Sequence, residues 1–102
     1  LRPLQLAFGI EAVNVVTMQS ISGAGFPGVP SMAISDNIIP YIANEEDRLS
    51  EEPAKIFGTI NNGSIVPYPM KISATCTRVP VTEGHLEVVS VKLKEKATLE
   101  QV

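Results

Sequence analysis

Three segments rich in β-branched residues constrain the fold of this chain more than any other feature: residues 12–20, 70–79 and 85–94. The first, AVNVVTMQS, has the composition and length of a buried strand. In the two later segments apolar and polar residues alternate, as in strands with one buried face. We predict three strands, with the hypothesis that the later two pair as a hairpin through residues 79–84.

Helices are expected at three places. Residues 1–8 fit the end of a helix that Gly9 stops. The run SEEP at residues 50–53 predicts a helix start, because serine caps helices, acids favour the positive end and proline is tolerated in a first turn. Gly58 would end that helix, and Thr98 is expected to begin another.

Strong breakers separate these elements. Glycines and prolines between residues 21 and 31 are too dense for a helix or a strand. Residues 35–47 should form loop and short helical turns, because Pro40 limits any helix there. Asn61-Asn62-Gly63 is a turn signal.

Composition and charge exclude several classes of protein. The chain has 102 residues, 44% hydrophobic and 19% charged, which fits one folding unit whose aliphatic core would gain from burial against another segment. A net charge of −3 with scattered lysines argues against nucleic-acid binding. No segment approaches the roughly 20 consecutive apolar residues of a membrane helix. No basic start leads into a secretion segment, so we expect a soluble protein without a membrane partner.

The chain contains one cysteine and one histidine. A single cysteine forms no internal disulfide, which favours a reducing cytoplasm, and the two residues are too few for a zinc site, so no metal is expected. Strand alternation places Cys76 on the apolar face with Ile72 and Ala74. We interpret Cys76 as a core residue and not as a nucleophile, because apolar surroundings raise the pKa of a thiol.

Arg78 and His85 are the first candidates for a functional site. Arg78 ends the apolar face of its strand, where a charge needs a negative partner, and His85 begins the next strand at its rim. A hairpin would bring both to the same end and face of the sheet. There a guanidinium suits a carboxylate and an imidazole can move protons near neutral pH. A structural ion pair or a satisfied histidine is the alternative.

Two further features are ambiguous taken alone. Glu52 and Lys55 lie three residues apart, so they are neighbours on one face of a helix, where such pairs are usually surface salt bridges. The glycines in residues 22–25 let a ligand approach the backbone but also serve tight turns, and the full dinucleotide fingerprint is missing.

Four segments together resemble consecutive signatures of the archaeal and fungal branch of aspartate-semialdehyde dehydrogenases: TMQSISGAGFPG, DNIIPYI, EEDRLSEEPAKI and CTRVPVTEGHLE. Their order and spacing match over residues 4–93, and QSISGAG paired with RVPVTEGH is more specific than either motif alone. The resemblance implies an α+β (α/β) fold, with a mostly antiparallel mixed sheet flanked by helices, as in the C-terminal domain of glyceraldehyde-3-phosphate dehydrogenase. Residues 1–102 would be a segment of the catalytic and dimerisation domain, with the N-terminal cofactor-binding domain and the cysteine nucleophile upstream.

The resemblance implies roles for single residues. His85 matches the acid/base histidine, Arg78 the arginine that binds the substrate carboxylate, and Gln19 the glutamine that orients the substrate. Glu52 corresponds to the acid that receives the substrate amino group, and Lys55 to the lysine that helps hold the phosphate.

The loop containing Ser22, Gly23 and Gly25 would approach the nicotinamide of NADP in the same resemblance. The implied reaction of the complete enzyme is the reversible reduction of β-aspartyl phosphate by NADPH to aspartate β-semialdehyde and phosphate, through a thioacyl intermediate, on the route to lysine, threonine and methionine. Its implied partners are the substrate, the rest of the polypeptide and further copies in a homodimer or homotetramer. This segment alone should be inactive.

Two alternatives remain open at this point. The first is archaeal malonyl-CoA reductase, which looks like a relative of the family with the same fold, thiol and cofactor but with a coenzyme A thioester as substrate. Glu52 and Lys55 favour the aspartyl substrate, because an amino group needs an acid and an acyl phosphate needs a cation. The second alternative belongs to a different functional class: the chain is a non-catalytic dimerisation module.

Overall fold

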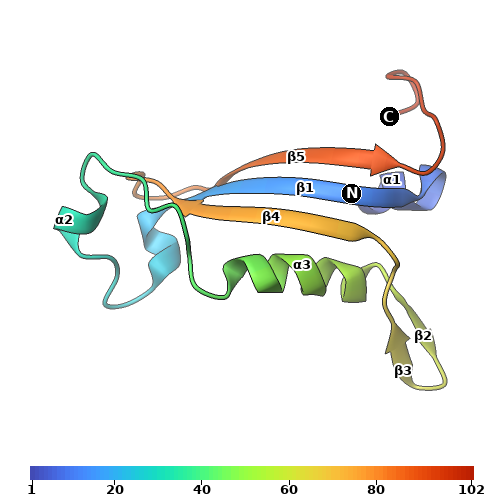
Figure 1. Cartoon of the computed structure of the whole chain (residues 1–102), viewed down its shortest axis with the longest axis horizontal. Helices are drawn as coiled ribbons and strands as arrows, with labels where there is room; N and C mark the ends of the chain where they lie inside the picture. The colour runs from blue at the N-terminus through green and yellow to red at the C-terminus, as the bar shows by residue number, and fades with distance from the viewer.

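Strand β1 (Ile10–Gln19) is the centre of a three-stranded sheet, between β4 (Lys71–Arg78) and β5 (Leu86–Leu93), in a computed structural model that covers residues 1–102 (Figure 1). It pairs in parallel with β4 and antiparallel with β5. The three predicted strands and the mixed sheet of an α+β fold are confirmed. The hairpin hypothesis is wrong: β1 inserts between the two later strands. The central position gives β1 a hydrogen-bonded strand on both edges from Ala12 to Met18, so the backbone of this stretch is paired on both sides.

Helix α3 (Glu45–Ile56) covers one face of the sheet, mainly against β4 (Figure 1). It begins five residues before the predicted start at Ser50, so Pro53 lies inside the helix and not in its first turn. The run Glu45-Glu46-Asp47 occupies the first turn, where acids interact favourably with the positive end of the helix. The N-cap is Asn44 with φ 65°, a cap that the usual serine or aspartate signal does not reveal.

Gly58 follows α3 and permits a tight approach of the next hairpin, β2 (Thr59–Asn61) and β3 (Ser64–Val66). A Cβ atom on Gly58 would lie 2.3 Å from the carbonyl oxygen of Val66, so any other residue would force the hairpin away. The turn between these strands contains Asn62 and Gly63, both with positive φ, which confirms the predicted turn. The two short strands were not predicted.

In the remaining segments some of the predicted secondary structure is present and some is not. Helix α1 (Arg2–Phe8) ends at Gly9, as predicted. The glycine-rich stretch was predicted to exclude helix, but a 3-10 turn, η1 (Ile21–Ala24), forms there because such a turn needs only a few i to i+3 bonds. Helix α2 (Ser31–Ile34) is a single turn. The helix predicted from Thr98 is wrong: residues 98–101 form one hydrogen-bonded turn.

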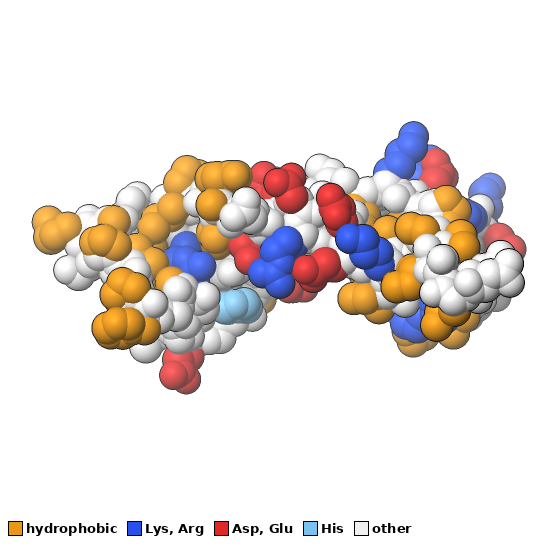
Figure 2. Space-filling model, turned by 90° about the horizontal axis from the view of Figure 1, so that it is seen from below, with side chains coloured by type: hydrophobic (Ala, Val, Ile, Leu, Met, Phe, Trp, Pro, Cys, Tyr) orange, Lys and Arg blue, Asp and Glu red, His pale blue; other side chains and the backbone are white.

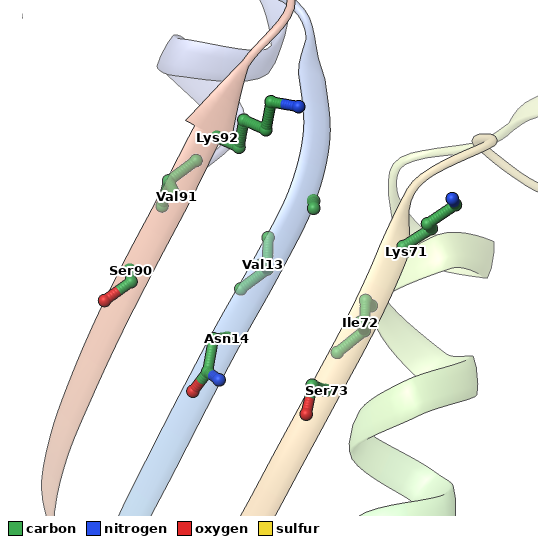
Figure 3. A pocket seen from close by; sticks show the side chains of 9 residues that line it. Val13, Asn14, Lys71, Ile72, Ser73, Ser90, Val91 and Lys92 are labelled. Atoms are coloured by element: carbon green, nitrogen blue, oxygen red, sulfur yellow. The ribbon is translucent and has the colours of Figure 1, made fainter.

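The face of the sheet opposite α3 is open. Asn14 pairs with Ser73 on one side and with Ser90 on the other, and these polar side chains line an open hollow of about 410 Å³ (Figure 3). Further along this face, Leu86 is 60% exposed and Val88 is 54% exposed. The molecule is therefore flat, 46 × 38 × 18 Å, and its radius of gyration of 16.5 Å exceeds the roughly 13 Å of a compact domain of this length.

Burial is concentrated along β1. The buried apolar residues are Ile10, Val13, Val15, Ile34 and Cys76, and the buried polar ones are Thr17, Gln19, Ser20 and Arg78. All four polar residues lie at the carboxyl ends of β1 and β4. None of the helices has the length and apolar character needed to cross a bilayer.

Candidate active site

The carboxyl end of β1 brings Arg78 and His85 together. Arg78 is the register partner of Gln19 on the parallel strand β4, and His85 precedes Leu86, which is opposite Met18 on β5. Both candidates therefore lie at one end of the sheet and, by strand alternation, on the face that carries Gln19. The sequence anticipated this juxtaposition through an incorrect hairpin, because two strands that flank a third can also share one end.

Arg78 is held in a buried position without a carboxylate. Its side chain is 6% exposed, and Nη1 donates to the carbonyl oxygen of Ser20. Its backbone bonds in both directions with Ile39, which brings the segment before α3 to the edge of β4. The salt bridges of the chain all lie elsewhere, so the expected negative partner of Arg78 is not one of its own acids. A guanidinium has five N–H donors, and the bond to Ser20 uses one of them.

His85 is fixed through one ring nitrogen. The backbone N–H of Ser20 donates to Nδ1 over 3.2 Å, and Ser20 Oγ lies 3.2 Å from the same nitrogen. An N–H only donates, whereas a hydroxyl also accepts, so Nδ1 has a partner in either protonation state of the ring. Nε2 is then the atom left for reacting groups, while Ser20 fixes the orientation of the ring.

Gly23 is the point where the two side chains meet. A Cβ atom built on Gly23 would lie 3.0 Å from His85 Cε1 and 3.2 Å from Arg78 Nη1. Any larger residue at position 23 would therefore push against both groups. The loop is anchored from the other side, because the backbone N–H groups of Ile21 and Ser22 donate to carbonyl oxygens of Val81 and Thr82.

The other two loop residues predicted to approach a cofactor differ from Gly23. Ser22 Oγ lies 3.0 Å from Ser20 Oγ, so it is linked to His85 through one hydroxyl. Gly25 has φ 67°, and nothing lies within 4 Å of its Cβ position, so the backbone there is open to approach.

Gln19 is buried and its amide is oriented by two acceptors. Nε2 donates to Glu45 Oε2 over 3.2 Å and to Thr17 Oγ1 over 3.4 Å. Glu45 was missed by the sequence interpretation, because it precedes the predicted start of the helix. The acidic run at residues 45–47 is the signal that could have placed it in a first turn.

Glu52 and Lys55 are not in contact with Arg78 or His85. Arg48 donates to Glu52 over 3.0 Å and also to Glu45 over 3.2 Å, while Lys55 donates to Glu51 over 3.1 Å. The hydrogen bond to Glu52, followed by the charges of Glu52 and Glu45, raises the pKa of the exposed Arg48 guanidinium. Figure 2 shows the histidine beside the acidic and basic side chains that gather over α3. Glu52 is thus connected to Gln19 through Arg48 and Glu45, whereas Lys55 is outside that chain.

Cys76 does not belong to this group of reactive residues. It is a free cysteine with 0% exposure, and its backbone N–H donates to Glu46 on α3. A thiol enclosed in this way cannot reach a substrate, in agreement with its interpretation as a core residue. No three potential metal-binding side chains cluster anywhere in the chain.

Comparisons with known proteins identify the family. Residues 1–102 match the family described as semialdehyde dehydrogenase, dimerisation domain. The aspartate-semialdehyde dehydrogenase of Archaeoglobus fulgidus is 48% identical over 99% of this chain and 29% of its own length. That of Schizosaccharomyces pombe is 50% identical over 100% of this chain and 30% of its own length. The chain therefore spans less than a third of these relatives.

Solved structures agree with this result. The crystal structure of aspartate semialdehyde dehydrogenase with NADP from Candida albicans matches with a TM-score of 0.82 and 44% identity, over 94% of this chain and 27% of that one. The Vibrio cholerae aspartate semialdehyde dehydrogenase II complexed with ASA matches with a TM-score of 0.76 and 32% identity, over 97% of this chain and 35% of that one. The resemblance drawn from the four sequence segments is confirmed, and the chain belongs to the semialdehyde dehydrogenase dimerisation domain family.

Proposed function

We propose that residues 1–102 form the substrate-handling part of an NADP-dependent aspartate-semialdehyde dehydrogenase, and that the complete protein reduces β-aspartyl phosphate to aspartate β-semialdehyde. The observation that carries the proposal is the meeting of Arg78 and His85 at Gly23. Membership of the family supports the same reading. A module that only dimerised would have no need to bury an arginine without a carboxylate partner.

Arg78 binds the substrate carboxylate in this proposal. Its guanidinium donates from one nitrogen to the Ser20 carbonyl oxygen, which holds that nitrogen beside the end of β1. A carboxylate ligand would supply the negative charge that the chain itself does not, with the bidentate geometry that arginine favours. Gln19, its register partner on β1, then orients the bound substrate from the same end of the sheet.

His85 moves protons at Nε2. As an imidazolium it would donate the Nε2 proton to the substrate oxygen that becomes negative during reduction, while Nδ1–H is accepted by Ser20 Oγ. In the reverse direction Nε2 takes the proton back. The thiol that forms the acyl intermediate is proposed to lie upstream of Leu1, because Cys76 is fully enclosed.

The loop of Ser22, Gly23 and Gly25 fits the approach of a nicotinamide ring. Apart from its chain neighbours, nothing lies within 4 Å of the Cβ position of Gly25, which leaves room for a planar group against this backbone. When bound, NADPH would supply the hydride. The loop contributes a fixed surface beside His85, and the rest of the cofactor would be held by the N-terminal domain.

Glu52 receives the substrate amino group and Lys55 helps hold the phosphate in this proposal. Both side chains are exposed, at 52% and 54%, and their partners Arg48 and Glu51 are on the same helix. Exposed pairs of this kind are held weakly, so an incoming ammonium or phosphate can replace Arg48 or Glu51.

An assay of the full-length protein tests the proposed function. With aspartate semialdehyde, NADP and phosphate, the proposal expects NADPH formation that depends on phosphate. Activity with malonyl-CoA alone would instead assign the protein to malonyl-CoA reductase. Unchanged turnover after substitution of Arg78 or His85, with altered association, would favour the dimerisation module.

The open face of the sheet is proposed to pair with a second copy in a homodimer. Leu86 and Val88 are apolar and exposed on this face, and the matched family is described as a dimerisation domain. Val88→Lys in the full-length protein should lower the mass seen by analytical ultracentrifugation to that of a monomer. An unaltered assembly would place the interface elsewhere, and a tetramer would require a further surface.

A further inference from the structure

Two serine hydroxyls form a chain behind the ring of His85. Ser20 Oγ lies 3.2 Å from His85 Nδ1 and 3.0 Å from Ser22 Oγ. Ser20 is 0% exposed, so its hydroxyl is shielded from bulk water and its hydrogen bonds are those made inside the protein. The hydroxyl of Ser20 thus connects the ring nitrogen to a second hydroxyl.

The backbone of Ser20 is held on both sides of its side chain. Its N–H donates to His85 Nδ1 over 3.2 Å. Its carbonyl oxygen accepts from the backbone N–H of Gly23 over 3.2 Å and from Arg78 Nη1. These contacts fix where the side chain starts, so the hydroxyl stays beside the ring.

The two groups of Ser20 that contact Nδ1 favour different forms of the ring. The backbone N–H only donates, so it favours an Nδ1 without a proton, and a neutral ring then carries its proton on Nε2. The hydroxyl also accepts, so it allows a proton on Nδ1. When it does so, its own proton can be donated to Ser22 Oγ. The hydroxyl is therefore what allows the neutral ring to have a free Nε2.

We propose that Ser20 is a positioning residue whose hydroxyl, supported by Ser22, stabilises the ring forms of His85 that carry a proton on Nδ1. One of these is the imidazolium, which gives a proton from Nε2, and the other is the neutral ring that takes it back there. Only the Nε2 proton is exchanged, because the Ser20 proton turns toward Ser22 and stays on its own oxygen. The inference rests on the proposed acid–base role of His85 and deepens it.

Ser20→Ala in the full-length enzyme tests the proposal, because it removes the hydroxyl and keeps the backbone N–H. The neutral ring should then carry its proton on Nε2, and the imidazolium should form at a pH lower by about one unit. Two-bond ¹H–¹⁵N NMR spectra of ¹⁵N-histidine-labelled protein measure both, and His85→Asn identifies the signals of the ring. kcat/KM for oxidation of aspartate semialdehyde should fall about tenfold, because the form with a free Nε2 is less populated.

The ionisable groups around the ring are the same in Ser20→Ala and in the unsubstituted enzyme. Arg78 approaches it from β4, and Glu87 follows it on the same face of β5. Glu45 reaches this end of the sheet from α3, and Glu83 lies in the loop before the ring. A difference in titration between the two proteins therefore reports the hydroxyl.

Two further variants separate the hydroxyl chain from a general loss of buried hydrogen bonds. Ser22→Ala should lower the pH midpoint of the ring by less than Ser20→Ala, and should add nothing in a Ser20→Ala background. Thr77→Val is the matched control, because Thr77 Oγ1 donates to the carbonyl oxygen of Thr17 at the same end of the sheet, over 2.7 Å. It should leave the titration of His85 unchanged.

The NMR titration separates this inference from the proposed function. If the full-length protein has no aspartate-semialdehyde dehydrogenase activity, the proposed function fails, and the ring still decides the role of Ser20. A lower midpoint in Ser20→Ala, with the neutral proton on Nε2, supports the proposal. A ring that keeps its tautomer and midpoint in that variant, or an equal shift from Thr77→Val, overturns it.

Discussion

Two regions carry residues proposed to bind substrate, but they are built differently: the carboxyl end of β1, and the outer ridge of α3, which is the exposed side of the helix that carries Glu52 and Lys55. At the end of β1, Arg78 and Gln19 are buried, and with His85 they are fixed by contacts with other elements. On the ridge, Glu52 and Lys55 are exposed and bond only to neighbours in their own helix. The first region is pre-organised by the fold, whereas the second exchanges partners with little cost.

This difference predicts which kinetic constant each region controls. Groups held in place before the substrate arrives contribute to the stabilisation of the transition state, so their loss should lower turnover. Exposed groups that bind substrate by replacing a neighbour contribute mainly to uniform binding, so their loss should raise KM.

His85→Asn in the full-length enzyme should have the largest effect. Asparagine can keep an acceptor near the Nδ1 position for the Ser20 N–H, but it has no group that exchanges protons at the Nε2 position. We expect kcat to fall by about 10² to 10⁴, the range typical of general acid–base catalysis. Steady-state assays with circular dichroism as the folding control measure this, and near-normal turnover in a folded variant would remove His85 from the chemistry.

Arg78→Lys should have the next largest effect. Lysine keeps the positive charge but loses the planar fork, so one buried bidentate contact with the carboxylate is replaced by a point charge. We expect kcat/KM to fall about a hundredfold. A semialdehyde that lacks the α-carboxylate provides the control, since its slow reaction should not slow further. An equal loss for both substrates would mean that Arg78 supports structure only.

Glu52→Gln should have the smallest effect of the three. It removes the charge proposed to meet the substrate amino group, so KM for aspartate semialdehyde should rise about tenfold with kcat nearly unchanged. Glu51→Gln, on the same exposed helix, should leave KM within about twofold. A fall in kcat without a change in KM would contradict the proposed contrast between ridge and sheet.

The strands could be predicted from the sequence because β-branched composition and alternation are local properties. Alternation also placed Cys76 and Arg78 on the buried face. The insertion of β1 between β4 and β5 could not be predicted, because it depends on a crossover of about fifty residues and not on any turn. Two strands joined by a short loop are expected to pair, and here the central strand prevents it.

The helix over the sheet shows why part of the site was missed. Asn44 caps α3 in a left-handed conformation, and Pro53 is accommodated inside the helix. The two strongest boundary signals, Ser50 as a cap and Pro53 as a first-turn residue, therefore indicated a later start. That error hid the first turn and with it the contact between Glu45 and Gln19, residues 26 positions apart. The resemblance supplied Gln19 as a site residue but gave no information on what orients it.

A crystal structure of the full-length protein with aspartate semialdehyde bound tests the central claim most directly. The account predicts that both oxygens of the substrate carboxylate lie within hydrogen-bond distance of the Arg78 guanidinium, with the aldehyde carbon beside His85 Nε2 and above Gly23. A substrate bound away from these two residues, with His85 and Arg78 engaged only by Ser20 as they are here, would contradict it.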